Sequence, residues 1–316
     1  MNKKKYVNRN YLTTTRIIAL GFLITVIVGT ILLSLPIASA NGTWTDLLTA
    51  AFTSTTSVCV TGLVVVDTFS YWSLFGKGVI LILIQIGGLG IVSIITLFML
   101  LFRMKITLKS TMLLQDAFNL NSKQGLLKFT IKVIKGTFLI EGIGAFIYSF
   151  YYCREYGLLK GIWFSVFHAV SAFCNAGLDI MGADSLIPYH SNLLMMLNTS
   201  FLIIMGGIGF IVWWDTVEAF RRIRTKKCSI RSAWNGVHLQ TKIAIFMTLL
   251  LLIGGTVVIY FLERSNPDTL GNLSEKDRIL NAFFQSVTLR TAGFAAVPQA
   301  ALRPVTAFFG ALLMMI

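Results

Sequence analysis

Residues 52–62 read Phe-Thr-Ser-Thr-Thr-Ser-Val-Cys-Val-Thr-Gly, and the same spacing from Phe to Gly occurs again at residues 167–177 and 283–293. The final glycines of the three copies are 115 and then 116 residues apart. Repetition at an even period indicates a fold built from equivalent units. Three evenly spaced copies also argue against the simpler interpretation that each is an ordinary turn between helices.

The stretches around these copies have the composition of a membrane protein. Of the 316 residues, 55% are hydrophobic and 13% are charged, which is too little charge to cover a soluble protein of this size. Several apolar runs are long enough to cross about 30 Å of hydrocarbon as helices. They are residues 16–36, 76–102, 130–152, 192–214 and 242–262, and a sixth begins near Pro304. The first run is too long for a cleavable signal peptide.

The net charge of +14 does not indicate nucleic-acid binding, because the basic residues gather in alternate connections. Residues 1–16, 103–135 and 215–242 hold 19 of the 27 Lys and Arg. Under the positive-inside rule these connections are cytoplasmic, and so is the N-terminus of this multi-pass chain. We interpret the basic run at residues 221–227 as a topology anchor, with contact to anionic lipid or a cytoplasmic partner as the alternative.

Each copy is predicted to end a short helix that enters the membrane from outside without crossing it. Ser/Thr-x-x-Asp pairs, which cap helix N-termini, precede the first copy at Thr43 and Asp46 and the third at Ser274 and Asp277. The second short helix is expected to start from Gly157. About four turns span only half the bilayer. Each unit therefore comprises an outer helix, a re-entrant pore helix, an extended glycine segment and an inner helix.

The three glycine segments form the predicted ion pathway. Irregular backbone is tolerated at membrane depth only where protein buries it or it lines a watery path. Glycine reaches backbone angles closed to other residues, and rings of carbonyl oxygens can replace the hydration shell of potassium. The C-termini of the short helices add partial negative charge. We predict an ion-binding selectivity filter at Val60, Thr61, Gly62, Asn175, Ala176, Gly177, Thr291, Ala292 and Gly293.

Charged residues in apolar surroundings need partners. Arg290, three residues before Gly293, is predicted to be structural and to point behind the filter into a hydrogen-bond network, with an electrostatic role in gating as the alternative. Glu141 is expected to face the protein interior and to have a basic or hydroxyl partner. Arg290 is one possible partner, which the sequence does not decide. The glycine-rich runs 85–90 and 205–209 favour close helix packing over ion contact.

Cysteine and histidine residues indicate no metal site. Cys59, Cys153, Cys174 and Cys228 have no paired spacing, so neither a zinc site nor a disulfide framework is predicted. His168 lies in an apolar pore-helix pattern and is expected to be packed and hydrogen-bonded rather than a metal ligand.

Together these motifs resemble the Trk/Ktr/HKT superfamily of potassium transporters, most closely the bacterial Ktr membrane subunit. The resemblance covers nearly the whole chain and rests on residues 60–68, 85–90, 175–177, 206–210 and 290–294. It implies an all-α polytopic membrane protein whose four helix–pore helix–helix repeats surround a central pore in pseudo-four-fold arrangement. The family's filter glycines correspond to Gly62, Gly177 and Gly293, and their presence implies a preference for potassium.

The resemblance also implies the setting in which the chain works. Members lie among lipid in the bacterial plasma membrane, form homodimers and are gated by a cytoplasmic nucleotide-binding regulatory ring. The Ktr members depend on sodium. Sodium is therefore expected as a coupling or activating ion beside potassium as the permeating ion, with no further cofactor.

The sequence divides into three expected units, residues 1–102, 103–220 and 221–316, the third stopping within its inner helix. A fourth filter glycine would fall at about position 408, one period after Gly293. We therefore expect a fragment or a truncated product that lacks the fourth repeat and the family's gate loop. Such a chain is not expected to conduct potassium alone.

Two other function classes fit the sequence less well. A secondary transporter of another cation or small solute can also have broken helices, but it usually carries inverted repeats and intramembrane acids or histidines. Here each unit begins and ends inside. A membrane enzyme would need clustered polar groups at one depth, whereas the sequence shows dispersed ones, so no enzymatic activity is predicted.

Overall fold

The computed structural model describes residues 14–90, 93, 126–182, 184–226 and 229–315. Throughout this part of the chain the regular structure is helical, and the only strand-like pairing is an isolated bridge between Ser39 and Trp72. The prediction of an all-α fold is confirmed.

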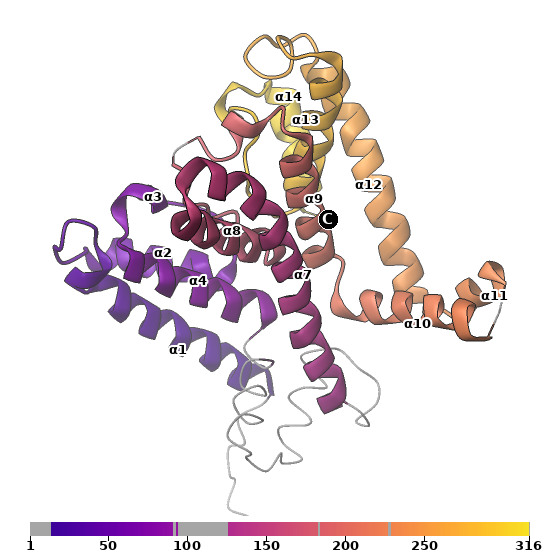
Figure 1. Ribbon diagram of the computed structural model, residues 1–316, viewed down its shortest axis with the longest axis horizontal. Coiled ribbons are helices and arrows are strands. Elements are labelled where there is room, and N and C mark those ends of the chain that lie inside the picture. Colours follow the sequence, from indigo (N-terminus) through magenta and orange to yellow (C-terminus); the bar gives the residue numbers. More distant parts are fainter. Residues whose placement is uncertain (1–13, 91–92, 94–125, 183, 227–228, 316) are drawn as a thin grey trace, which may run out of the picture.

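The helices fall into three groups of similar order. The first contains α1 (Thr14–Ser34), α2 (Leu47–Cys59), α3 (Thr68–Tyr71) and α4 (Leu74–Leu89); the second α7 (Leu126–Tyr156), α8 (Leu158–Phe173), α9 (Leu193–Gly207) and α10 (Phe210–Lys226); the third α12 (Leu239–Glu263), α13 (Glu275–Thr288) and α14 (Pro304–Met314). Helix α11 (Ile230–Asn235) lies between the second and third groups. Each group contains one 3-10 turn, at Pro36–Ala38, Ile187–Tyr189 and Gln299–Ala301. Figure 1 shows the groups side by side in chain order, with α4 packed on α8 and α9 on α13.

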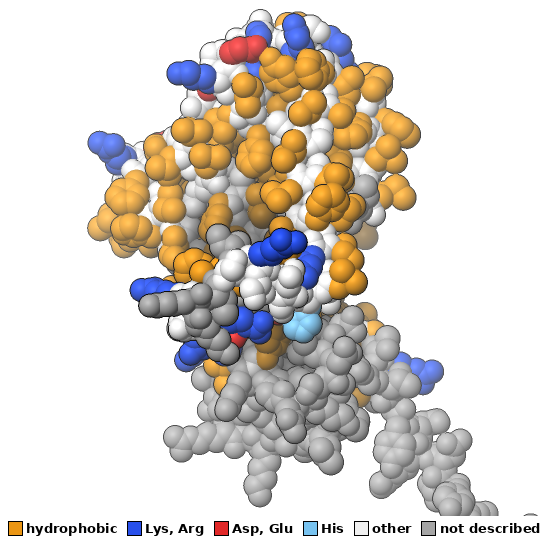
Figure 2. Space-filling view, turned by 90° about the vertical axis from the view of Figure 1, so that its right-hand side faces the viewer, with side chains coloured by type: hydrophobic (Ala, Val, Ile, Leu, Met, Phe, Trp, Pro, Cys, Tyr) orange, Lys and Arg blue, Asp and Glu red, His pale blue; other side chains and the backbone are white. Residues whose placement is uncertain are grey.

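The first helix of each group is long and apolar enough to cross a membrane. The qualifying stretches are Arg16–Ser34, Phe129–Tyr156 and Leu239–Glu263. Many of their large apolar side chains face outward: Leu23 is 54% exposed, Phe146 64% and Ile253 63%. Such exposure is expected of lipid-facing positions, and Figure 2 shows the resulting broad hydrophobic surface.

The second helix of each group is too short to span a bilayer. Helices α2, α8 and α13 contain 13, 16 and 14 residues, which corresponds to roughly 20–24 Å against about 30 Å of hydrocarbon. Helix α8 starts after Gly157, and Ser274 caps α13 by accepting the N–H of Asp277, both as expected. The first cap differs by three residues. The carboxylate of Asp46 itself accepts the N–H groups at the start of α2, so Asp46 replaces Thr43 as N-cap.

The apolar run at residues 192–214 is bent, so the expectation of one straight crossing is wrong. Helix α9 ends at Gly207, and α10 leaves it at an angle of 100°. Gly209 lies between them with φ +93°, a left-handed conformation that interrupts a helix. The indole nitrogen of Trp213 donates to the carbonyl oxygen of Met205 at 2.8 Å and holds the corner. In Figure 1, α10 runs across the foot of α12.

The apolar run at residues 76–102 is interrupted as well. Helix α4 ends at Leu89, and Gly90 follows with φ +78°. Apart from Ser93, the rest of that run lies outside the described residues.

Candidate functional site

The three glycine segments share one backbone conformation. All three predicted filter glycines have positive φ angles: +76° at Gly62, +62° at Gly177 and +87° at Gly293. The residue two positions before each glycine is also left-handed, with φ +56° at Val60, +58° at Asn175 and +67° at Thr291. Apart from these three, Ser185 is the only described non-glycine residue with a positive φ. Equal spacing in the sequence thus corresponds to equal backbone geometry.

The left-handed conformation is strained at the residue two positions before each glycine. Left-handed φ angles are uncommon outside glycine and strained for β-branched residues such as Val60 and Thr291. The same strained position nevertheless recurs in all three segments, so the surrounding structure must hold it in each.

A hydroxyl group near the end of each short helix, α2, α8 and α13, is hydrogen-bonded to the residue that follows the glycine. Thr56 Oγ1 accepts the N–H of Leu63 at 3.1 Å. In the other two units the hydroxyl donates instead, from Ser171 to the Leu178 carbonyl at 2.5 Å and from Thr288 to the Phe294 carbonyl at 2.7 Å. These hydroxyl latches, Thr56, Ser171 and Thr288, were not predicted. Their signal in the sequence is a Ser or Thr five or six residues before each glycine.

The three segments converge on one small region. A Cβ atom added to Gly62 would lie 2.8 Å from the carbonyl oxygen of Ala176, and one added to Gly177 would overlap the carbonyl oxygen of Ala292. A Cβ on Gly293 would lie 3.2 Å from the Cα of Gly177 and 3.9 Å from the Cα of Gly62. The structure therefore brings together glycines that lie more than 100 residues apart, with only backbone atoms between them.

The glycines near the ends of α4 and α9 pack directly against the short helices α2 and α8, and the predicted close packing is confirmed. A Cβ on Gly87 would overlap the carbonyl oxygen of Val58, and one on Gly206 would overlap that of Phe173. Val58 and Phe173 each precede their filter glycine by four residues, so the same contact occurs in both units. Gly88 additionally approaches the Cys174 side chain so closely that a Cβ there would overlap its sulfur.

Arg290 lies beside the convergence and does not reach Glu141. Together with Asn175, Gly207 and Thr291 it lines a cavity of about 160 Å³. Its Nη2 donates to Thr248 Oγ1 at 3.4 Å, and this is the one bond of the Arg290 side chain within the described residues rather than the predicted network. The open option of an Arg290–Glu141 pair is therefore not realised.

Glu141 is buried against an amide instead of a base or a hydroxyl. Gln85 Nε2 lies 3.0 Å from Glu141 Oε1 and 3.3 Å from Oε2, and Cys174 Sγ approaches Oε1 at 4.0 Å. Glu141 is 4% exposed. The carboxyl group thus joins α7 to the inner helix of the preceding unit, directly behind the second glycine segment.

His168 is packed among aromatic rings, with ring centroids 5.0 Å from Tyr148 and 4.9 Å from Phe294. The expected hydrogen bond is absent: neither ring nitrogen has a partner within the described residues. No group of three or more His, Cys, Asp or Glu suited to a metal occurs in this part of the chain.

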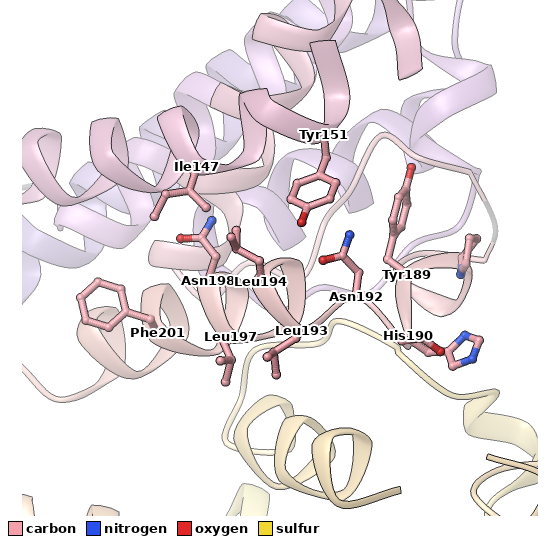
Figure 3. Close-up of a pocket in the computed structure, with 12 residues that line it drawn as sticks. Ile147, Tyr151, Tyr189, His190, Asn192, Leu193, Leu194, Leu197, Asn198 and Phe201 are labelled. Carbon is pink, nitrogen blue, oxygen red and sulfur yellow. The ribbon is translucent and has the colours of Figure 1, made fainter. Parts of the chain in front are cut away.

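A separate groove of about 960 Å³ lies away from the glycine segments. Figure 3 shows Ile147 and Tyr151 of α7 facing Asn192 and Asn198, at the start of and along α9. None of the predicted filter residues lines this groove.

A family model for TrkH cation transport proteins matches residues 3–316. The chain belongs to the TrkH family. Its relatives include the potassium/sodium uptake protein NtpJ of Enterococcus hirae, 40% identical over 92% of this chain and 61% of that protein. The Ktr system potassium uptake protein B of Bacillus subtilis is 37% identical over 100% of this chain and 68% of that protein.

Among solved structures, the potassium transporter TrkH from Vibrio parahaemolyticus matches this TrkH-family chain with a TM-score of 0.61 at 16% identity. The match covers 99% of this chain and 57% of that one and shows a shared fold. The chain spans 61% of the length of the Enterococcus relative and 68% of the Bacillus relative.

Proposed function

We propose that this chain takes part in potassium uptake across the bacterial plasma membrane, with the three glycine segments forming sides of a selectivity filter. The observation that carries this proposal is the shared backbone. Left-handed residues at the glycine and two positions before it recur in all three units, and the three glycines meet. The names of the relatives, a potassium/sodium uptake protein and a Ktr potassium uptake protein, agree with it.

In this proposal the carbonyl groups of the filter residues replace the water around a potassium ion, and the pore has pseudo-four-fold symmetry. Residues 1–102, 103–220 and 221–316 act as successive units of that pore. The chain is oriented with its N-terminus in the cytoplasm. It works as a membrane subunit of a homodimer with a cytoplasmic nucleotide-binding ring, and sodium acts as a coupling or activating ion rather than as an enzyme cofactor.

The test replaces Gly177 with serine in the protein as its gene encodes it. The φ of +62° at Gly177 disfavours any L side chain, and the new atoms would meet the Ala292 carbonyl. We expect weaker selection of potassium over sodium, measured as competition between the two ions for uptake by bacteria that lack other potassium uptake systems. Gly62→Ser should act in the same direction.

Gly254→Ser serves as the matched control, because a Cβ at Gly254 in α12 meets no atom within 4 Å. Membrane insertion is checked for each variant by immunoblotting of membranes. Unchanged selectivity in both Gly62→Ser and Gly177→Ser would remove these glycines from the ion path and favour transport of another solute.

A further inference from the structure

The bend between α9 and α10 creates an apolar groove. The groove, of about 370 Å³, lies where α7, the α9–α10 corner and α12 meet. Gly136 and Ile140 of α7, Ile208 and Trp214 at the corner, and Ile245 of α12 contribute to its walls. Thr216 is also part of the lining, but its hydroxyl already donates to the Val212 carbonyl at 2.7 Å. The groove therefore offers an almost wholly hydrophobic surface.

Two lysines of α7 lie close to residues that line this groove. Lys132 is one helical turn before Gly136, and its Nζ lies 5.4 Å from the centre of the Trp214 ring. Lys135 is adjacent to Gly136. Both side chains are exposed, and neither forms an ion pair within the described part of the chain. These lysines are on the proposed cytoplasmic side of α7, and Trp214 beside them is typical of a membrane boundary.

The acidic groups of α10 already have partners. Asp215 Oδ2 lies 2.8 Å from His238 Nδ1 and accepts the Thr241 hydroxyl at 2.6 Å. Glu218 pairs with Arg222 at 3.4 Å. Positive charge is therefore left over along this border. In Figure 2, a group of Lys and Arg side chains lies at the lower edge of the hydrophobic surface on this side.

We propose that the groove binds one acyl chain of an anionic phospholipid from the cytoplasmic leaflet, with the phosphate beside Lys132 and Lys135. An apolar groove beside two exposed lysines that form no ion pair within the described residues matches the two parts of such a molecule. A zwitterionic lipid would fill the groove equally well but would gain less from the lysines. The site rests on the membrane orientation proposed above and not on the identity of the transported ion.

The bound lipid would brace the second glycine segment. Trp213, next to Trp214, holds the corner through Met205, and Gly206 packs on the carbonyl of Phe173. A Cβ on Gly207, the last residue of α9, would lie 3.1 Å from the side-chain amide of Asn175. A continuous chain of contacts thus joins the groove to a left-handed filter residue.

The test measures quenching of tryptophan fluorescence by brominated phospholipid in vesicles that contain the purified protein. Brominated phosphatidylglycerol is compared with brominated phosphatidylcholine, and the difference between the unmodified protein and Trp214→Phe gives the signal from the groove. We expect preference for phosphatidylglycerol. Lys132→Gln and Lys135→Gln should each reduce that preference roughly fivefold, the effect of one surface charge. Lys160→Gln, at the start of α8, should leave it unchanged.

Filling the groove provides a second, independent arm. Ile245→Phe should lower quenching at Trp214 by both lipids, whereas Ile253→Phe, on the exposed part of the same helix, should not. Equal quenching by the two lipids in the unmodified protein, or a preference that survives loss of both lysines, would overturn the proposal. Because the readout is lipid contact, a failure here is distinguishable from a failure of the filter assignment, which ion competition tests.

Discussion

Gln85 of α4 and Glu141 of α7 are joined by a hydrogen bond of 3.0 Å between Nε2 and Oε1, across two different units. Removing either partner leaves the other without its bond, at buried Glu141 or at partly buried Gln85, which costs about 1–3 kcal/mol. We expect Glu141→Leu and Gln85→Leu each to lower the free energy of unfolding in detergent micelles by that amount.

The double variant should lose less than the sum of the two single losses, because neither unpaired group is then left behind. Glu141→Gln, which retains hydrogen-bonding capacity at the same position, is the conservative control and should be nearly neutral. Strict additivity in this cycle would show that the two side chains are not energetically coupled.

Gly206→Ala should destabilise the protein through the close contact with Phe173. The added methyl group would meet a backbone carbonyl, which cannot rotate away, and overpacking of this kind costs about 1–3 kcal/mol. Gly78→Ala is the comparison, since a Cβ at Gly78 in α4 has no neighbour within 4 Å. There we expect equal or higher stability, as alanine favours helix. Thermal unfolding of the two variants side by side measures the difference, and equal transitions would contradict the packing described.

Glu263→Ala should destabilise the end of the third group at which α14 begins. Its carboxylate, 1% exposed, accepts the backbone N–H of Arg303 at 2.9 Å and the hydroxyl of Thr306 at 2.5 Å, which caps α14. It also accepts bonds from Asn266 and Thr269, each at 2.7 Å. Because several buried donors would lose their acceptor, we expect a loss of about 2–5 kcal/mol in unfolding free energy.

Glu218→Ala is the control for this loss. Glu218 is an exposed acid paired only with Arg222, and such pairs contribute about 0.3–0.5 kcal/mol. If both variants lost the same small amount, the carboxylate of Glu263 would have no special role in holding α14.

Reporter fusions test the proposed orientation. A fusion after Lys227 should report the cytoplasm, because the basic run before it is retained there. A fusion after Asp184 should report the outside, since that connection follows the second re-entrant segment. A cytoplasmic signal at Asp184 would contradict the re-entrant arrangement of α8.

The positions of this site that could be predicted from the sequence are those that favour glycine. Gly62, Gly177 and Gly293 stand where φ is positive, and their regular spacing after Phe revealed the three short helices. The assignment of these glycines to an ion path stays a prediction. By contrast, Val60 and Thr291 belong to types that disfavour left-handed φ, so their conformation could not be anticipated. The conformation of Val60 and Thr291 depends on the surrounding structure, and part of that structure is the set of hydroxyl latches, which were not predicted.

The bend at Gly209 and the partner of Glu141 could not be predicted from the sequence, for a different reason. Hydropathy measures how apolar a run of residues is, but it does not show where the helix axis changes direction. Residues 192–214 were therefore interpreted as one membrane crossing. Gln85 precedes Glu141 by 56 residues in another unit, and only the packing of α4 behind the second glycine segment brings them together.

The left-handed glycines have a stereochemical consequence. The positive φ that is strained for an L residue is the ordinary conformation of its mirror image. A D-alanine introduced at Gly177 by chemical ligation would not be strained by the positive φ, and its methyl group would not take the position beside the Ala292 carbonyl oxygen that the Cβ of an L residue would occupy. Gly177 therefore excludes an L side chain for two reasons, the sign of φ and the nearby carbonyl group, whereas Val60 and Thr291 show that a positive φ alone can be accommodated with a side chain present.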